Sequence, residues 1–166
     1  MPDLFTVDNK KNIFAFIINI IITEGCGVLS WYLGMSNPET YAGLIKPSLM
    51  PHSLVFYIVW PILYFLIAIA AYRIWLKGKG KVKICKAKIL YIVQLILNFL
   101  WTIIFFRFRL IGLAFIELML MLIFILLTTF EFFRLDKTSG ILMIPYILWV
   151  SFAGVLNFTY WMLNNM

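Results

Sequence analysis

The sequence predicts an all-α integral membrane protein in which residues 1–166 form a single bundle of five transmembrane helices. Hydrophobic residues make up 64% of the chain and charged residues 13%, and the mean hydropathy is +0.99. A soluble domain of this size exposes too large a share of its surface to bury so much apolar area. Continuous apolar runs favour helices, because the strands of a membrane barrel alternate over about 10 residues. Five runs reach the roughly 20 residues that cross a bilayer, at residues 13–34, 54–76, 84–106, 110–134 and 141–163.

The first apolar run, residues 13–34, is interpreted as a helix of the mature protein. A polar segment, residues 1–12, precedes it, and we expect that segment to be frayed. Lys10 and Lys11 before an apolar run are typical of a signal peptide. This run is too long for one, however, contains Glu24 and ends without a small-residue cleavage site.

The distribution of basic residues predicts how the helices are oriented. Five spans put eleven of the fourteen Lys and Arg residues on one side, namely Lys10, Lys11, Arg73, Lys77, Lys79, Lys81, Lys83, Lys86, Lys88, Arg134 and Lys137. The other side receives Lys46, Arg107 and Arg109. The positive-inside rule then places the N-terminus in the cytoplasm and the first loop and the C-terminus outside. The net charge of +7 therefore reflects topology and contact with anionic membrane lipid, and we expect no nucleic-acid partner.

The longest connection, residues 35–53, is predicted to be a lid over the outward helix ends. Prolines interrupt helix formation within it, yet it keeps apolar side chains that a solvated loop does not need. We therefore expect the loop to fold back on the helix ends. The candidate lid residues are Tyr41, Lys46, Pro47, Leu49, Pro51 and His52.

Three of the helices carry an aromatic or amide face, because residues three or four apart share one side of a helix. In the second helix this face is made by Tyr57, Trp60 and Tyr64, and Pro61 favours a kink there. In the third helix the face contains Gln94, Asn98, Trp101 and Phe105. In the fifth helix it contains Trp149, Ala153, Asn157, Tyr160 and Asn164. The fourth helix is the most uniformly apolar, with Glu117 as an exception.

These faces are predicted to meet at similar depth beneath the lid. At a rise of about 1.5 Å per residue, Trp60, Trp101 and Asn157 lie about 9–11 Å below the outward helix ends, and Asn98 and Ala153 lie slightly deeper. A polar side chain that faces lipid costs free energy, so the amides should point inward or pair. An aromatic cavity with a few amides suits a flat, largely apolar ligand with a small polar edge.

The same residues also allow structural interpretations, which the sequence leaves open. Trp and Tyr are enriched in the interfacial belts of membrane proteins, and Trp60, Trp101 and Trp149 can serve packing as well as a pocket. A carboxyl group inside a membrane is costly, so Glu117 and Glu24 are functional candidates. Each can equally be a protonated acid that is bonded to a neighbouring helix.

No catalytic or metal-binding motif accompanies these residues. The sequence lacks the GxSxG and HExxH patterns, a phosphate-binding glycine loop and paired carboxylates. His52 is the single histidine, and Cys26 and Cys85 have no metal-binding spacing. We therefore expect no metal and no cofactor, and we expect the protein not to be an enzyme unless the tryptophans themselves react.

The arrangement of motifs resembles one known family. Residues 40–52 read TYAGLIKPSLMPH, which is similar to the loop pattern WYxxLxKPxWxPP, and VWPILY follows at residues 59–64. Residues 94–106 read QLILNFLWTIIFF, and residues 144–149 read IPYILW. Order, spacing and length together resemble the translocator protein family, also called tryptophan-rich sensory proteins or peripheral-type benzodiazepine receptors, from about residue 27 to residue 164.

The resemblance implies a five-helix bundle, often dimeric, that binds porphyrins, sterol-like lipids and synthetic aromatic ligands under the first loop. Family pocket positions correspond to Trp60, Asn98, Trp101, Trp149 and Ala153. In some bacterial members the tryptophans that match Trp60 and Trp149 are linked to light-dependent breakdown of protoporphyrin, so these two are the candidate catalytic residues.

The chain departs from the family pattern at three places. Leu49 replaces the loop tryptophan and His52 replaces the second proline, so ligand choice can differ. The cholesterol pattern of animal members needs a basic residue after the C-terminal tyrosine, and none follows Tyr160.

The sequence thus predicts a membrane receptor or sensor for porphyrins or other flat apolar molecules. The candidate ligand-binding residues are Tyr57, Trp60, Tyr64, Asn98, Trp101, Tyr146, Trp149, Ala153 and Asn157. Two alternatives are a light-dependent degrader of protoporphyrin and a transporter of tetrapyrroles or lipids. Expected partners are the apolar ligand, membrane lipid and a second copy in a homodimer.

Overall fold

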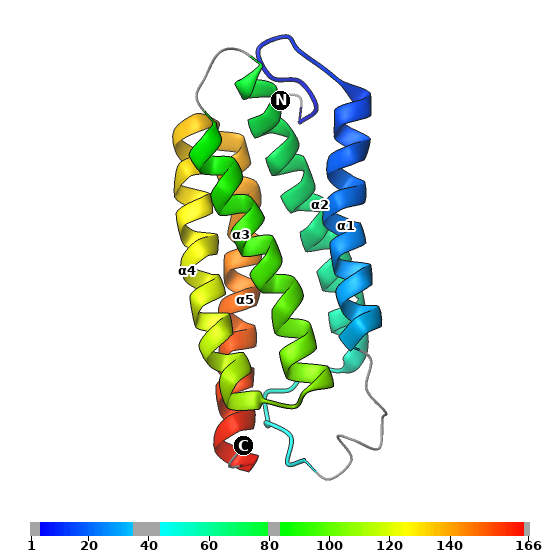
Figure 1. Cartoon of the computed structure of the whole chain (residues 1–166), viewed down its shortest axis with the longest axis vertical. Coiled ribbons are helices and arrows are strands. Elements are labelled where there is room, and N and C mark those ends of the chain that lie inside the picture. The colour runs from blue at the N-terminus through cyan, green and yellow to red at the C-terminus, as the bar shows by residue number, and fades with distance from the viewer. Residues whose placement is uncertain (1–3, 35–43, 80–83, 165–166) are drawn as a thin grey trace.

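The computed structural model describes residues 4–34, 44–79 and 84–164, and over these residues the chain forms a bundle of five long antiparallel helices (Figure 1). Their bounds are Ile13–Gly34 for α1, Ser53–Gly78 for α2, Cys85–Thr102 for α3, Ile111–Leu135 for α4 and Lys137–Asn164 for α5. Each described helix, with α3 extended to Arg107, is long and apolar enough to cross a membrane. The predicted all-α, five-span membrane fold is confirmed.

Most helix ends lie within two residues of the sequence-based bounds, and two ends have local features that the sequence pattern did not reveal. The α5 helix begins at Lys137, four residues before the predicted start, because the Asp136 carboxylate accepts hydrogen bonds from the Ser139 backbone N–H (2.9 Å) and hydroxyl (2.7 Å). A side-chain acceptor at this position satisfies a free N–H of the first helical turn. The third span ends in a single π-helical turn, η2 (Ile103–Arg107), which widens the helix before the short connection to α4.

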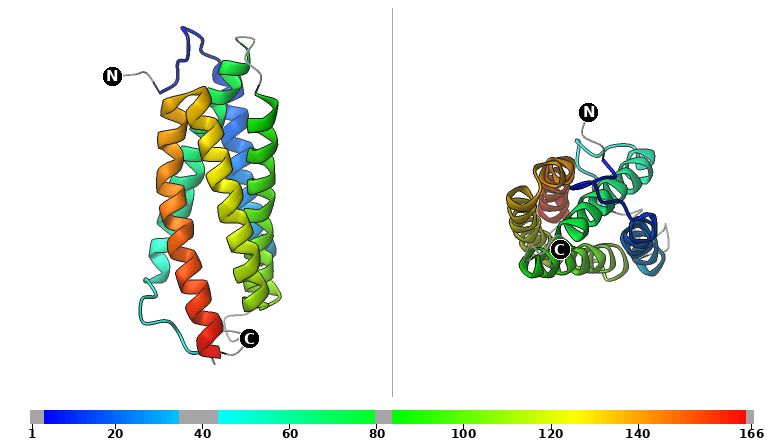
Figure 2. Two further views of the ribbon diagram at one scale, coloured as in Figure 1. Left: turned by 90° about the vertical axis from the view of Figure 1, so that its left-hand side faces the viewer. Right: turned by 90° about the horizontal axis from the view of Figure 1, so that it is seen from above.

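The helices do not contribute equally to the core. The α5 helix packs against both α4 and α2, and α3 packs against α4. Within the described residues, α1 packs only against α2, α3 and η2, so it stands at one side of the bundle in the end-on view of Figure 2. The faces of α1 and α3 therefore meet the membrane over much of their length.

Residues 4–12, the described part of the N-terminal segment, are not frayed, although their polarity predicted that they would be. Residues 4–12 lie over the end of α2, where the Tyr72 hydroxyl donates to the Phe5 carbonyl at 3.1 Å. The Arg73 guanidinium donates to the Leu4 carbonyl at 3.0 Å. Side-chain donors at the helix end thus satisfy the backbone of a segment that forms no helix of its own.

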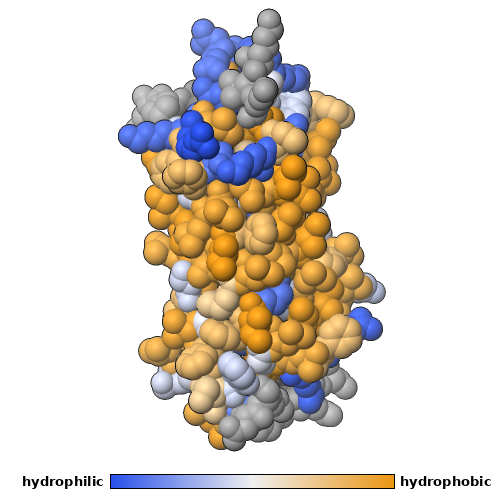
Figure 3. All heavy atoms as spheres, turned by 60° about the vertical axis from the view of Figure 1, so that its left-hand side comes forward, coloured by the Kyte–Doolittle hydropathy of each residue, from blue (hydrophilic) through white to orange (hydrophobic). Residues whose placement is uncertain are grey.

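The surface of the bundle is an apolar belt between two polar ends. Figure 3 shows this belt on the face that it presents, with hydrophilic residues gathered above and below. Large apolar side chains remain exposed on every helix, among them Ile21, Ile62, Ile96, Ile116 and Leu148. Exposing such a belt to water would cost free energy through the hydrophobic effect, whereas contact with lipid tails does not.

Candidate ligand-binding site

An aromatic cluster around Trp60 occupies the half of the bundle that contains the beginning of α2 and the end of α5. The Trp60 indole stacks on Tyr64 of the same helix, with ring centroids 5.5 Å apart. It lies 6.4 Å from Trp101 of α3 and 6.5 Å from Tyr146 of α5. Three helices therefore meet through one indole, and aromatic pairs at these distances attract each other beyond simple burial.

A buried amide, Asn98 of α3, connects two phenols of this cluster. The Tyr64 hydroxyl donates to the Asn98 Oδ1 atom at 2.5 Å, and the Asn98 Nδ2 atom donates to the Tyr146 hydroxyl at 2.8 Å. Asn98 is 1% exposed and Tyr146 is 1% exposed. The amide thus holds α2, α3 and α5 together, and its pairing satisfies polar groups that lipid could not.

A second buried amide, Asn157 of α5, does the same for α3 and α4. The Trp101 Nε1 atom donates to the Asn157 Oδ1 atom at 3.1 Å, and the Asn157 Nδ2 atom donates to the Ile111 carbonyl at 2.9 Å. Ile111 is the first residue of α4, so this bond joins α5 to the beginning of α4. Asn98, Asn157 and Gln94 were all predicted to point inward or pair: the first two do both, and Gln94 is buried at 0% exposure without a partner among the described residues.

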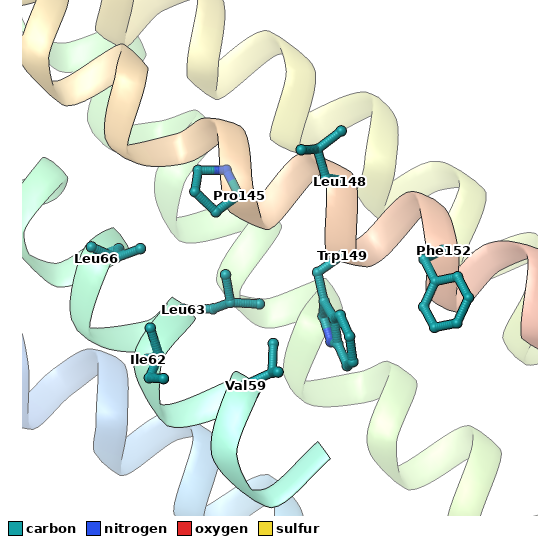
Figure 4. Close-up of a pocket in the computed structure, with 8 residues that line it drawn as sticks. All are labelled: Val59, Ile62, Leu63, Leu66, Pro145, Leu148, Trp149 and Phe152. Atoms are coloured by element: carbon teal, nitrogen blue, oxygen red, sulfur yellow. The ribbon is translucent and has the colours of Figure 1, made fainter. Parts of the chain in front are cut away.

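The structure also contains a groove between α2 and α5, with a volume of about 470 Å³ (Figure 4). From α2 it is lined by Val59, Ile62, Leu63 and Leu66, and from α5 by Pro145, Leu148, Trp149 and Phe152. The lining is almost entirely apolar. Ile62 is 54% exposed and Leu148 66% exposed on its rim, so the groove opens toward the lipid rather than toward water.

Trp149 supplies the one polar atom of the groove wall. Its indole points from α5 toward Val59 and Leu63 of α2 (Figure 4). It makes an edge contact with Phe56, with ring centroids 5.5 Å apart, and a tilted contact with Phe152 at 5.7 Å. The Nε1 atom is buried and has no hydrogen-bond partner among the residues that the structure describes. A buried N–H without a partner is costly, and it offers a donor to a ligand that brings an acceptor.

The predicted site residues thus divide between the cluster, the groove and the surface. The aromatic cluster and its amides bring together Trp60, Tyr64, Asn98, Trp101, Tyr146 and Asn157, with Ala153 buried beside them. Of the predicted residues, Trp149 alone lines the groove. Tyr57 points away from both and is 62% exposed, although it was predicted to share a face with Trp60.

The described part of the lid crosses the end of α5. The Asn164 side chain donates to the Ile45 carbonyl (3.1 Å) and accepts from the Ile45 N–H (2.9 Å), as a neighbouring strand would. Of the candidate lid residues, Pro47 is buried, Pro51 is half-buried, and Lys46, Leu49 and His52 are exposed. The His52 Nδ1 atom accepts from the Leu54 N–H at 3.3 Å and caps α2. Tyr41 lies outside the described residues.

Several groove residues were not selected from the sequence. Leu63, Leu148 and Phe152 carry no polar group that could mark them, and a groove depends on the distance between two helices, which no spacing along one helix reveals. Glu117, a functional candidate, has both carboxylate oxygens buried without a hydrogen-bond partner among the described residues, but it lines neither the groove nor the lid. Among the described residues, no three His, Cys, Asp or Glu side chains are placed to hold a metal ion.

Comparison with known proteins places this architecture among membrane proteins of one kind. The model of the TspO/MBR family matches residues 19–162. A tryptophan-rich protein TspO of Chlorobaculum tepidum is 36% identical over 135 residues, which cover 81% of this chain and 80% of the relative. A tryptophan-rich sensory protein of Cereibacter sphaeroides is 39% identical over 127 residues, covering 76% and 77%. The translocator protein of Homo sapiens is 32% identical over 142 residues, covering 85% and 84%.

Proposed function

Since the chain belongs to the TspO/MBR family, we propose that it is a membrane receptor that binds porphyrins or similar flat apolar molecules in the groove between α2 and α5. Family membership supports a sensor or receptor role for an integral membrane protein. The ligand class is our inference from the groove, from the neighbouring aromatic cluster and from the resemblance described above.

The observation that carries the proposal is the unpartnered Trp149 N–H in an apolar groove. In the same half of the bundle, the amides of Asn98 and Asn157 form hydrogen bonds to neighbouring helices. These amides therefore stabilise helix packing and are not available to a ligand. A macrocycle with apolar faces and an acceptor at its edge would match the groove. Its faces would cover the aliphatic walls, and its acceptor would take a hydrogen bond from the indole N–H.

The open rim of the groove favours access from the membrane. Exposed apolar residues on the rim face the lipid tails, in which porphyrins and similar molecules partition. We propose in addition that the basic end of the bundle lies in the cytoplasm, as the positive-inside rule requires, so that the groove lies in the outer half of the bilayer.

Titration of the purified protein with protoporphyrin IX in the dark, followed by tryptophan fluorescence, tests the proposal. Trp149→Phe keeps an aromatic ring but removes the N–H, so we expect the dissociation constant to rise about three- to tenfold, as for one neutral hydrogen bond. Trp161→Phe, on the same helix but packed against Phe115 and Phe158, is the matched control. Equal affinities of the two variants for protoporphyrin IX would contradict binding in the groove.

A second function is favoured by the position of the same indole. A porphyrin in the groove would lie against Trp149, close enough for the indole to donate one electron to the photoexcited macrocycle. This transfer would leave an indole radical cation and a porphyrin radical anion, and molecular oxygen would react with the reduced macrocycle. Illumination of the saturated complex distinguishes the two functions. Stable absorption supports a receptor, and oxygen-dependent bleaching that Trp149→Phe abolishes supports photochemical degradation.

A further inference from the structure

A second groove lies at the opposite, basic end of the bundle, between α1, α2 and α3. Its volume is about 430 Å³, and its walls include Trp75 of α2, Leu95 of α3 and Phe132 of α4. Ile22 of α1 and Ile96 of α3 line it and are each 53% exposed, so the groove opens to the membrane between the helix that stands apart and its neighbour.

The depth of this groove matches one leaflet of a bilayer. Along α3 its lining runs from Lys88 to Phe99. At a rise of about 1.5 Å per residue this is about 16 Å, close to half of the roughly 30 Å hydrocarbon core. Lys88 lies one turn inside the beginning of α3, where a lysine stem can follow apolar surface and hold its ammonium group at headgroup level.

Lys88 is the cation that lines the groove, and its ammonium group has no counter-charge among the described residues. Neighbouring cations at this end are engaged: Lys77 pairs with Asp8 at 3.1 Å, and Lys86 pairs with Glu131 at 2.5 Å. Lys79 lies 4.2 Å from the Trp75 ring centroid. The Lys88 side chain has no hydrogen bond or ion pair with any residue that the structure describes.

Two other polar side chains of the groove, Tyr91 and Asn19, are already bonded. The Tyr91 hydroxyl pairs with the Thr23 hydroxyl at 2.6 Å, and the Asn19 amide donates to the Ala15 carbonyl at 2.8 Å. The groove therefore combines a long apolar wall with one free positive charge at its membrane-surface end.

We propose that this groove binds one anionic membrane lipid, with an acyl chain along α3 and the headgroup phosphate at the Lys88 ammonium. A basic pocket between transmembrane helices on the positive side of the membrane suits an anionic headgroup. The lipid would fill the gap between α1 and α3 and hold α1 to the rest of the bundle.

Fluorescence quenching with brominated lipids tests the site, because Trp75 lines it. The protein in a zwitterionic detergent is titrated with dibromostearoyl phosphatidylglycerol and, separately, with the matching phosphatidylcholine. We expect saturable quenching that Trp75→Phe removes, with tighter binding of phosphatidylglycerol. Lys88→Gln should weaken phosphatidylglycerol binding about fivefold, which is the usual effect of one lysine near an anionic surface, and leave phosphatidylcholine binding unchanged.

Two further variants make the test specific. Lys137→Gln removes an exposed lysine at the same end of the bundle but outside the groove, and it should leave both affinities unchanged. Ile96→Phe narrows the groove from its exposed rim and should weaken binding of both lipids. Equal binding of the two lipids, or equal effects of Lys88→Gln and Lys137→Gln, would overturn the proposal. The proposal would also be overturned if the protein were a dimer that shows no quenching and that Ile96→Phe dissociates. In that case a second copy of the chain, not a lipid, would cover the groove.

Discussion

Replacing Asn98 by Leu tests whether the buried amide holds three helices together. The change removes the acceptor of the Tyr64 hydroxyl and the donor to the Tyr146 hydroxyl, at a site that is 1% exposed. Two hydrogen bonds at the membrane average of about 0.6 kcal/mol each set a floor of about 1 kcal/mol. Two buried hydroxyls that lose a partner cost about 1–3 kcal/mol each in protein interiors. We therefore expect the unfolding free energy to fall by about 2–6 kcal/mol, the sum for the two hydroxyls.

The assay is reversible unfolding in mixed micelles by increasing mole fraction of sodium dodecyl sulfate, followed by circular dichroism. The triple variant Tyr64→Phe/Asn98→Leu/Tyr146→Phe should recover most of the lost stability, because no polar group then remains without a partner. Tyr57→Phe is the control, since the Tyr57 side chain is largely exposed. If the triple variant is as unstable as the summed single losses, the network interpretation is refuted and Asn98 acts by some other means.

Three further perturbations follow from the structure. Burial acts to raise the pKa of Asp136, but hydrogen bonds from Arg73 and from Ser139 outweigh it and hold the pKa below its ordinary value. The stabilisation of the fold by the ionised Asp136 carboxylate is therefore complete above the unfolded pKa of about 4 and is lost as the pH falls through the lower folded pKa. Acid unfolding in micelles should show this loss. Asp136→Asn should abolish that part of the pH dependence. Gly27→Ala should lower stability by about 1–3 kcal/mol, because a Cβ atom there would overlap the Tyr64 ring, and a neutral result in the same dodecyl sulfate titration would mean that the ring moves aside. Gln94→Leu should leave the protein as stable or more stable, since the Gln94 amide is 0% exposed with no partner among the described residues; a loss above about 1 kcal/mol would show that the amide is bonded.

The helix bounds show how far local pattern reaches. Hydropathy is summed along the chain, so five spans could be predicted without knowing any contact, and their ends came within a few residues. The largest difference, at the beginning of α5, came from a carboxylate cap at Asp136, which no hydropathy window detects. Residues 4–12 were mispredicted for a related reason, because their order depends on donors from Tyr72 and Arg73, which lie 67 and 69 residues further along the chain than the carbonyls they bind.

The candidate site shows where the pattern stops being sufficient. Helical spacing correctly placed Trp60 and Tyr64 on one face, and the cost of amides in lipid correctly turned Asn98 and Asn157 inward. The same spacing put Tyr57 on that face, yet Tyr57 is 62% exposed while Tyr64 is 7% exposed. Periodicity sets the angle of a side chain around its helix axis, but it does not say whether a neighbouring helix is present at that height.

The sequence by itself therefore determined the solvent, the number of spans, the basic end and the inward-facing polar residues, because each depends on the composition of a single segment. Only the tertiary structure decided which polar groups satisfy one another and which remain available. Asn98 meets Tyr64 and Tyr146 because three helices pack at one level, whereas Trp149 lies at a gap between α2 and α5, and Lys88 at a gap between α1 and α3. A gap arises from the separation of two packed surfaces, so it is a property of a pair of helices and is not encoded in the pattern of either one.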